Sequence, residues 1–140
     1  MSKIAVVYWS GTGNTEAMAN AVIDGITEAG AEGTLFTASE FDPSRINAYD
    51  AIAFGCPSMG NEELEDSEFG PMFEACRKNL SGKRIALFGS YGWGGGEWMR
   101  AWESVCDGDG AKRAAESVIC CEAPDDEVIE ACRNLGKALI

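Results

Sequence analysis

The chain has 140 residues, 46% of them hydrophobic, which is enough for one compact domain with a core and too few for two ordinary domains. Its formal net charge of −12 argues against nucleic-acid or anionic-membrane binding, because both need a concentrated basic surface. No apolar run approaches the roughly 20 residues of a membrane span, and the first residues enter strand-like alternation without a small-residue cleavage site. We therefore expect a single domain over residues 1–140, located in the cytoplasm, with basic macromolecular partners.

Cysteine usage predicts no metal site. The six cysteines form no CxxC motif, and the chain has no histidine to complete a zinc site. An iron–sulfur cluster would need more closely spaced thiolates. Because most of the thiols fall in apolar segments, we expect reduced, buried side chains rather than ligands or disulfides. The cysteines are Cys56, Cys76, Cys106, Cys120, Cys121 and Cys132.

Strands and helices alternate along the chain. Short apolar runs rich in branched and aromatic residues predict five strands, at 3–9, 33–38, 51–55, 83–89 and 115–121. Helix-like segments follow near 15–29, 66–79, 97–106 and 125–139, and the last carries an apolar stripe of Val128, Cys132, Leu135 and Leu139. The link between the second and third strands lacks a long helix, and its Asp42-Pro43 pair indicates the start of a short turn.

The apolar pattern of the strands predicts the architecture. Runs such as IAVVYW and AIAFG are apolar on nearly every residue, as in parallel strands that are buried on both faces by helices. The alternation therefore predicts a three-layer, doubly wound α/β fold with a five-stranded parallel sheet. Such sheets bind ligands at the carboxyl ends of their strands, which directs attention to the loops at 10–15, 56–65 and 89–97.

The first of these loops, SGTGNT, is built of glycines and hydroxyl side chains. Gly11 and Gly13 allow backbone dihedrals that let successive N–H groups converge at the start of the next helix. Ser10, Thr12 and Thr15 add hydroxyl donors, and the helix dipole favours an anion there. The loop predicts a phosphate site, although a strand-to-helix turn that needs only glycine and a capping hydroxyl shares these features.

The same loop indicates which phosphate it holds. A nucleoside-triphosphate loop would end in Gly-Lys-Ser/Thr, and this loop contains neither lysine nor arginine. It also departs from the dinucleotide motif GxGxxG, because Glu16 stands where the third glycine is needed and would sit badly beside a pyrophosphate. A single terminal phosphate fits better.

The second loop has a flexible tip followed by many acids. Met59 offers a polarizable contact for an aromatic face, and Gly60 lets the peptide it shares with Asn61 reorient at little cost. The alternative is a loop whose acids favour the first turn of the following helix, which is our interpretation for Glu65, Asp66 and Glu68.

The third loop, GSYGWGGGEW, exposes an indole among glycines. No neighbouring side chain shields Trp93, so we expect it to stack on a planar ligand, with a protein-partner contact as the alternative. Trp98 and Trp102 are four residues apart on the next helix and are more typical of core packing. A phosphate site, a methionine-tipped loop and an indole at one sheet edge describe a ligand with one phosphate and a planar ring, such as flavin mononucleotide (FMN).

Over essentially its full length, the sequence resembles the short-chain flavodoxins, particularly those of anaerobic bacteria. The segments YWSGTGNTE, GCPSMGNEELEDS and LFGSYGWGGGEW are similar to the three flavin loops of that family, in order and at the usual spacing. The resemblance implies the strand order 2-1-3-4-5 and noncovalently bound FMN. It implies a low-potential one-electron carrier, not an enzyme, that shuttles electrons between redox enzymes through semiquinone and hydroquinone states.

The resemblance also implies roles for individual residues. Met59 would lie on the inner flavin face and Trp93 on the outer face, and the Glu62 carboxylate would accept a hydrogen bond from flavin N3. The Gly60–Asn61 peptide would flip on one-electron reduction, so that the Gly60 carbonyl meets N5. The implied cofactor-binding residues are Ser10, Gly11, Thr12, Gly13, Asn14, Thr15, Ser58, Met59, Gly60, Asn61, Glu62, Ser90, Tyr91, Gly92, Trp93 and Gly94.

Three other functions compete with this one. A flavin or quinone reductase on the same fold would need a second nucleotide site, and no arginine cluster lies near the loops. A phosphoacceptor module would need acids after the first strand and an aspartate ending the third, where Tyr8-Trp9 and Gly55-Cys56 stand instead. A flavin storage protein remains open. The expected partners are redox proteins with basic docking patches, and we expect this protein itself to be a monomer.

Overall fold

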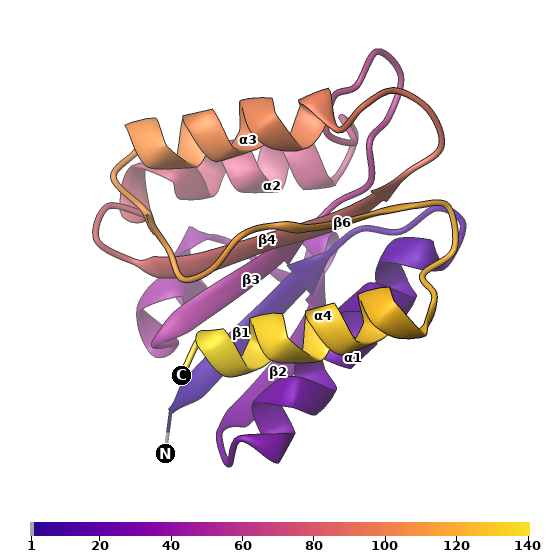
Figure 1. The fold of residues 1–140 in the computed structure, drawn as a ribbon. Coiled ribbons are helices and arrows are strands. Elements are labelled where there is room, and N and C mark those ends of the chain that lie inside the picture. The colour runs from indigo at the N-terminus through magenta and orange to yellow at the C-terminus, as the bar shows by residue number, and fades with distance from the viewer. Residues whose placement is uncertain (1) are drawn as a thin grey trace.

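A parallel β-sheet lies at the centre of the computed structural model, which describes residues 2–140 (Figure 1). Its strands are β1 (Lys3–Tyr8), β2 (Glu32–Thr37), β3 (Ala51–Gly55), β4 (Arg84–Tyr91), β5 (Lys112–Arg113) and β6 (Val118–Cys121). The spatial order is β2-β1-β3-β4-β5, and β6 also pairs with β4 in parallel. The order 2-1-3-4-5 is thereby confirmed, with β5 and β6 sharing the fifth position.

Helices cover both faces of this sheet (Figure 1). Helices α1 (Asn14–Glu28) and α4 (Asp126–Ala138) lie on one face, and α2 (Phe69–Cys76) and α3 (Glu97–Gly108) lie on the other. Short 3₁₀ turns occupy Ala38–Glu40, Pro43–Ala48 and Arg77–Asn79. Among residues 2–140, no helix is both long and apolar enough to cross a membrane.

The fifth strand differs from the continuous run predicted at 115–121. Ile85 pairs with Arg113 and Phe88 pairs with Val118, so the edge chain advances five residues while β4 advances three. The two extra residues leave the ladder as a bulge. Glu103 of α3 holds this bulge, because its carboxylate accepts hydrogen bonds from Arg113 and from Ser117, at 3.1 and 2.6 Å. The alternation pattern carries no signal for such an insertion.

Alternation along the strands divides the core in two. On β1, Ala5 and Val7 pack towards α2 and α3, whereas Ile4 and Val6 pack towards α1 and α4. The predicted core roles of Trp98 and Trp102 are confirmed, since both indoles are buried. All six cysteines are free thiols, and all except Cys121 are buried. The apolar stripe of α4 faces the sheet with Cys132, Leu135 and Leu139 fully or almost fully buried.

Helices α1 and α4 touch through two glycines. A Cβ at Gly25 would lie 2.0 Å from the carbonyl oxygen of Arg133, and a Cβ at Gly136 would lie 2.3 Å from that of Val22. Real Cβ atoms do not approach backbone that closely, so both positions need glycine. This contact fixes α1, and with it the loop that precedes α1, against the rest of the protein.

We predict that Gly25→Ala lowers the free energy of unfolding by about 1–3 kcal/mol, because the helices must separate to admit the methyl group. Urea denaturation measures the change. Gly108→Ala is the matched control: that glycine ends α3 and has open space around it, so alanine should stabilise the protein by about 0.5 kcal/mol. Equal effects of the two substitutions would contradict the packing argument.

Candidate functional site

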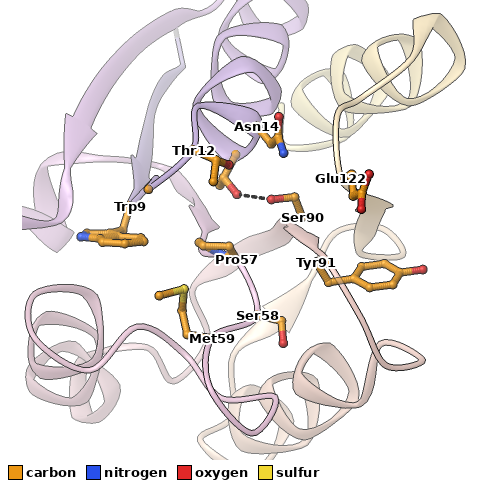
Figure 2. A pocket seen from close by; sticks show the side chains of 12 residues that line it. Trp9, Thr12, Asn14, Pro57, Ser58, Met59, Ser90, Tyr91 and Glu122 are labelled. Carbon is orange, nitrogen blue, oxygen red and sulfur yellow. Dashed lines mark hydrogen bonds between the residues drawn. The ribbon is translucent and has the colours of Figure 1, made fainter.

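A pocket of about 270 Å³ opens at the carboxyl ends of β1, β3 and β4 (Figure 2). All three loops singled out in the sequence contribute to it. Figure 2 shows Trp9 and Met59 along one side and Tyr91 and Glu122 along the opposite side. The lining residues are Trp9, Gly11, Thr12, Asn14, Thr15, Pro57, Ser58, Met59, Ser90, Tyr91, Gly92 and Glu122.

Backbone N–H groups of the first loop gather around the Ser10 hydroxyl at the start of α1. The Ser10 hydroxyl oxygen accepts the N–H groups of Gly13 and Glu16, at 3.1 and 3.2 Å, which folds the loop over the start of α1. Gly13 adopts a φ of 97°, in the left-handed region that favours glycine. The first backbone bond within α1 runs from Ala17 to Gly13, at 3.0 Å, so the N–H groups ahead of it have no helical acceptor. Ser10 accepts two of these N–H groups, and a helix N-terminus with further free N–H groups is a setting that favours an anion without a charged side chain.

A buried hydrogen bond joins the first loop to the third. The hydroxyl oxygens of Thr15 and Ser90 lie 2.9 Å apart, and the two side chains are 1% and 5% exposed. The dashed line in Figure 2 marks this contact. Both residues line the pocket. Their hydroxyl groups therefore hold the loops together as well as facing the space between them.

The second loop is anchored at both ends and free at its tip. Met59 and Glu63 exchange two backbone hydrogen bonds, at 2.7 and 2.9 Å. Between them, Gly60 and Glu62 have positive φ values of 52° and 57°. Gly60 and Asn61 line a neighbouring cavity of about 410 Å³, which also borders Met59. The tip therefore borders this cavity, and not the pocket itself, with a glycine and an asparagine.

Glu62 ties the second loop to the third. Its carboxylate accepts the N–H group of Glu97 at 3.0 Å, at the first residue of α3. A Cβ at Gly94 would lie 2.6 Å from the same carboxylate, and Gly94 has a φ of 87°. Glycine at that position lets the third loop pass close to Glu62. The two loops consequently form one connected wall.

Trp9 was missed as a site residue because it ends an apolar run and was assigned to a strand. The strand ends at Tyr8, and the indole of Trp9 instead lines the pocket and the two cavities beside it. Its Nε1 donates a hydrogen bond to Glu68 at 3.2 Å. A Trp directly after the first strand and before a glycine loop was the available signal.

Pro57 and Glu122 are two further lining residues absent from the prediction. Pro57 directly follows the third-strand segment, so its place at the strand end was readable. Glu122 follows β6 with a positive φ of 62°, and its N–H group donates to the Tyr91 carbonyl at 2.7 Å. Its place depends on the bulge before β6, which the sequence pattern does not show.

Trp93 lies outside the lining of the pocket and is 62% exposed. Several other predicted site residues border the pocket only indirectly. Ser10 and Gly13 line a cavity of about 400 Å³ that shares Trp9 and Gly11 with the pocket. No lysine or arginine lines the pocket or this cavity among the described residues. Neither the pocket nor this cavity therefore has a fixed positive side chain in its described lining.

Known proteins resemble this chain in sequence and in structure. The family model described as Flavodoxin matches residues 6–136. The chain belongs to the flavodoxin family. It is 43% identical over 135 residues to the flavodoxin of Megasphaera elsdenii and 41% identical over 134 residues to that of Clostridium beijerinckii, with 96% of both chains covered in each case. The solution structure of the two-electron reduced Megasphaera flavodoxin covers 97% of each chain, with a TM-score of 0.90.

This flavodoxin is accordingly a low-potential electron carrier that uses FMN, an electron-transfer protein rather than an enzyme. Burial raises the pKa of the Cys56 thiol, next to Pro57 of the pocket, to about 12, so the group stays protonated at neutral pH. Redox proteins are its partners.

Glu65 fixes the path of the second loop in this flavodoxin. The side chain is only 4% exposed, and its carboxylate accepts N–H groups from Ser67, Glu68 and Phe69, at 2.7 to 2.8 Å, and the Ser67 hydroxyl. Burial would raise the pKa of Glu65, but these hydrogen bonds outweigh it and lower the pKa. Helix α2 begins at Phe69, whose N–H group donates to Glu65, and not at residue 66 as predicted. The last part of the predicted helix, residues 77–79, is a 3₁₀ turn.

We predict that Glu65→Gln lowers the free energy of unfolding by about 1–3 kcal/mol at pH 7, because the amide turns a donor towards N–H groups that need an acceptor. The carboxylate's contribution is complete above its ordinary pKa of 4.5 and disappears as the pH falls through the lowered pKa. Denaturant titrations at pH 7 and at a series of pH values below 4.5 follow this loss. The control is Asp66→Asn, at the exposed neighbouring residue, which should change the free energy of unfolding by a few tenths of a kcal/mol. If the stability difference between wild type and Glu65→Gln stayed the same at low pH, the role assigned to the Glu65 carboxylate would be wrong.

Proposed function

We propose that the first loop holds the FMN phosphate through Ser10, Gly11, Thr12, Gly13, Asn14 and Thr15. The observation that carries this proposal is the N-terminus of α1, where the first helical bond runs from Ala17 to Gly13 and the N–H groups ahead of it, apart from those of Gly13 and Glu16 that Ser10 accepts, are available to an anion. Ser10 supports the loop from behind by accepting two N–H groups, so its own hydroxyl proton is free to donate. Neutral donors of this kind solvate a phosphate without lysine or arginine.

The ring site in this proposal lies between the second and third loops. Trp9, Pro57 and Met59 supply apolar walls of the pocket, and Ser58, Ser90, Tyr91 and Gly92 supply its floor and far side. When bound, FMN supplies an isoalloxazine ring that accepts and releases single electrons. Trp93, already exposed at the mouth of the third loop, closes over the outer face of that ring.

The tip of the second loop is proposed to adjust the polar contacts of the ring. The paired ends at Met59 and Glu63 stay fixed, while the Gly60–Asn61 peptide can rotate because glycine tolerates both backbone conformations. Glu62 adds a carboxylate that accepts a hydrogen bond from the ring edge. The Glu62 carboxylate also packs against Gly94 of the third loop, so a conformational change in the second loop shifts the third loop as well.

Acidic side chains around the site favour a low potential. At about 10 Å and an effective dielectric constant near 30, one carboxylate opposes an added electron by about 1 kcal/mol, or about 40 mV for one electron. Glu62 and Glu122 lie at or beside the pocket, whose lining contains no lysine or arginine among residues 2–140, and Arg100 is near enough to Glu62 to offset part of that charge. The summed effect of these carboxylates disfavours the negative charge that the flavin ring gains with its second electron.

The acidic surface is proposed to meet basic patches on redox partners. The formal charge of −12 favours fast, short-lived complexes guided by electrostatics. We infer that the chain works as a single FMN-binding domain and as a monomer. The six free thiols fit a reducing cytoplasm.

The phosphate assignment predicts that FMN binds at least about 100-fold more tightly than riboflavin, which lacks the phosphate, because each charge-assisted hydrogen bond contributes about 1.5–3 kcal/mol. Quenching of flavin fluorescence during titration measures both affinities. Equal affinities would remove the phosphate from the first loop.

The stacking assignment predicts that Trp93→Ala weakens FMN binding by about 1–3 kcal/mol, by loose analogy with aromatic platforms under nucleobases. Trp93→Phe keeps a ring and should retain most of the affinity. The fold should be insensitive to both changes because Trp93 is mostly exposed. Unchanged FMN affinity in the alanine variant would take Trp93 out of the ring site.

A further inference from the structure

A second cavity lies on the other side of the phosphate loop from the ring pocket. It has a volume of about 400 Å³ and shares Trp9 and Gly11 with the pocket, so the loop and the indole separate the two spaces. Because the cavity borders the first loop at Ser10, Gly11 and Gly13, it is the neighbouring space available to a group that extends beyond a phosphate held there. Its lining residues are Tyr8, Trp9, Ser10, Gly11, Gly13, Glu16, Thr37, Ala38, Ser39 and Glu68.

Two carboxylates are held in place at this cavity. The Tyr8 hydroxyl donates to Glu16 Oε2 at 3.0 Å, and the Trp9 Nε1 donates to Glu68 Oε1 at 3.2 Å. Burial and the Glu16 carboxylate raise the pKa of Tyr8, which keeps the phenol protonated and donating. No lysine or arginine lines the cavity within the described chain. Both acids are exposed residues, and each carboxylate is held at the cavity by one side-chain hydrogen bond.

We propose that Glu16, with Glu68 beside it, is a specificity determinant that makes the site select FMN and reject flavin adenine dinucleotide (FAD). The inference rests on the proposed phosphate site in the first loop. FAD continues from the first phosphate into a second phosphate, an ionised group that must leave the loop on its outer side. Glu16 and Glu68 place negative charge there, and like charges that lack a counterion repel.

Charge, rather than shape, carries this selection. The cavity has room, and its indole wall would suit a nucleoside, so nothing steric forbids the longer cofactor. Glu16 also stands at the third residue of α1, where a dinucleotide-binding loop uses glycine to let a pyrophosphate approach. FMN ends at its single phosphate, so it places no second negatively charged group in the acidic cavity.

Competition between the two flavins tests the proposal. The FMN-loaded full-length protein is incubated with rising FAD, free flavin is removed, and the bound FMN and FAD are quantified by chromatography. We expect wild type to need at least about a 100-fold excess of FAD to lose half of its FMN. Glu16→Gln, which keeps an acceptor for Tyr8, should lower that excess about three- to tenfold, and Glu68→Gln should act in the same direction.

Asp24→Asn is the matched control, because it removes the same charge from an exposed position about two turns further along α1. It should change the required excess less than twofold, and high salt should shrink the effect of Glu16→Gln. Gln variants that match the Asp24 control, or a wild type that takes up both flavins equally, would overturn the inference while leaving the phosphate site intact. A wild type that holds no FMN would overturn the proposed site and, with it, this inference.

Discussion

The site depends on backbone pairing that continues past the ends of the strands. Trp9 donates to the Gly55 carbonyl at 3.0 Å, Ser58 donates to that of Ser90 at 2.9 Å, and Glu122 donates to that of Tyr91 at 2.7 Å. Each loop is therefore in register with its neighbour before any side chain contributes. The buried hydroxyl pair of Thr15 and Ser90 then couples α1 to this same edge. A binding site made of loops is rigid here because the loops begin as extensions of the sheet.

The sequence was most informative where one physical requirement decides a residue type. Buried parallel strands need uninterrupted apolar runs, and a phosphate loop needs glycine and neutral donors, so the parallel sheet and the three loops could be predicted from the residues, whereas the strand order came from the family resemblance. Trp9 could not be separated from its strand, since an indole suits both a buried strand and a pocket wall. Glu122 was also missed, because its place follows from a two-residue bulge beside β4 that Glu103 stabilises from another helix. Such tertiary contacts leave no periodic trace.

Acidic residues serve opposite purposes within a few residues of one another. Glu65 is buried, and its carboxylate is fully engaged by N–H groups at the start of α2. Glu16 and Glu68 each accept one side-chain hydrogen bond and keep the rest of their charge facing a cavity. Net charge alone does not distinguish the two cases, whereas the number of hydrogen bonds that each carboxylate accepts does. Some of the acids behind the formal charge of −12 thus stabilise the fold, and others produce a negative potential at the carboxyl edge of the sheet.

The absence of a cation among the residues that line the phosphate loop follows from the same field. A lysine there would strengthen phosphate binding, but it would also stabilise added negative charge on a nearby ring and so raise its potential. Backbone N–H groups at a helix N-terminus hold the anion with partial charges that act over a short range. The basic side chains of Lys83, Arg84 and Lys112 instead border a cavity at the amino ends of β4 and β5. At the proposed phosphate site, neutral donors therefore reconcile binding of the anion with a low potential.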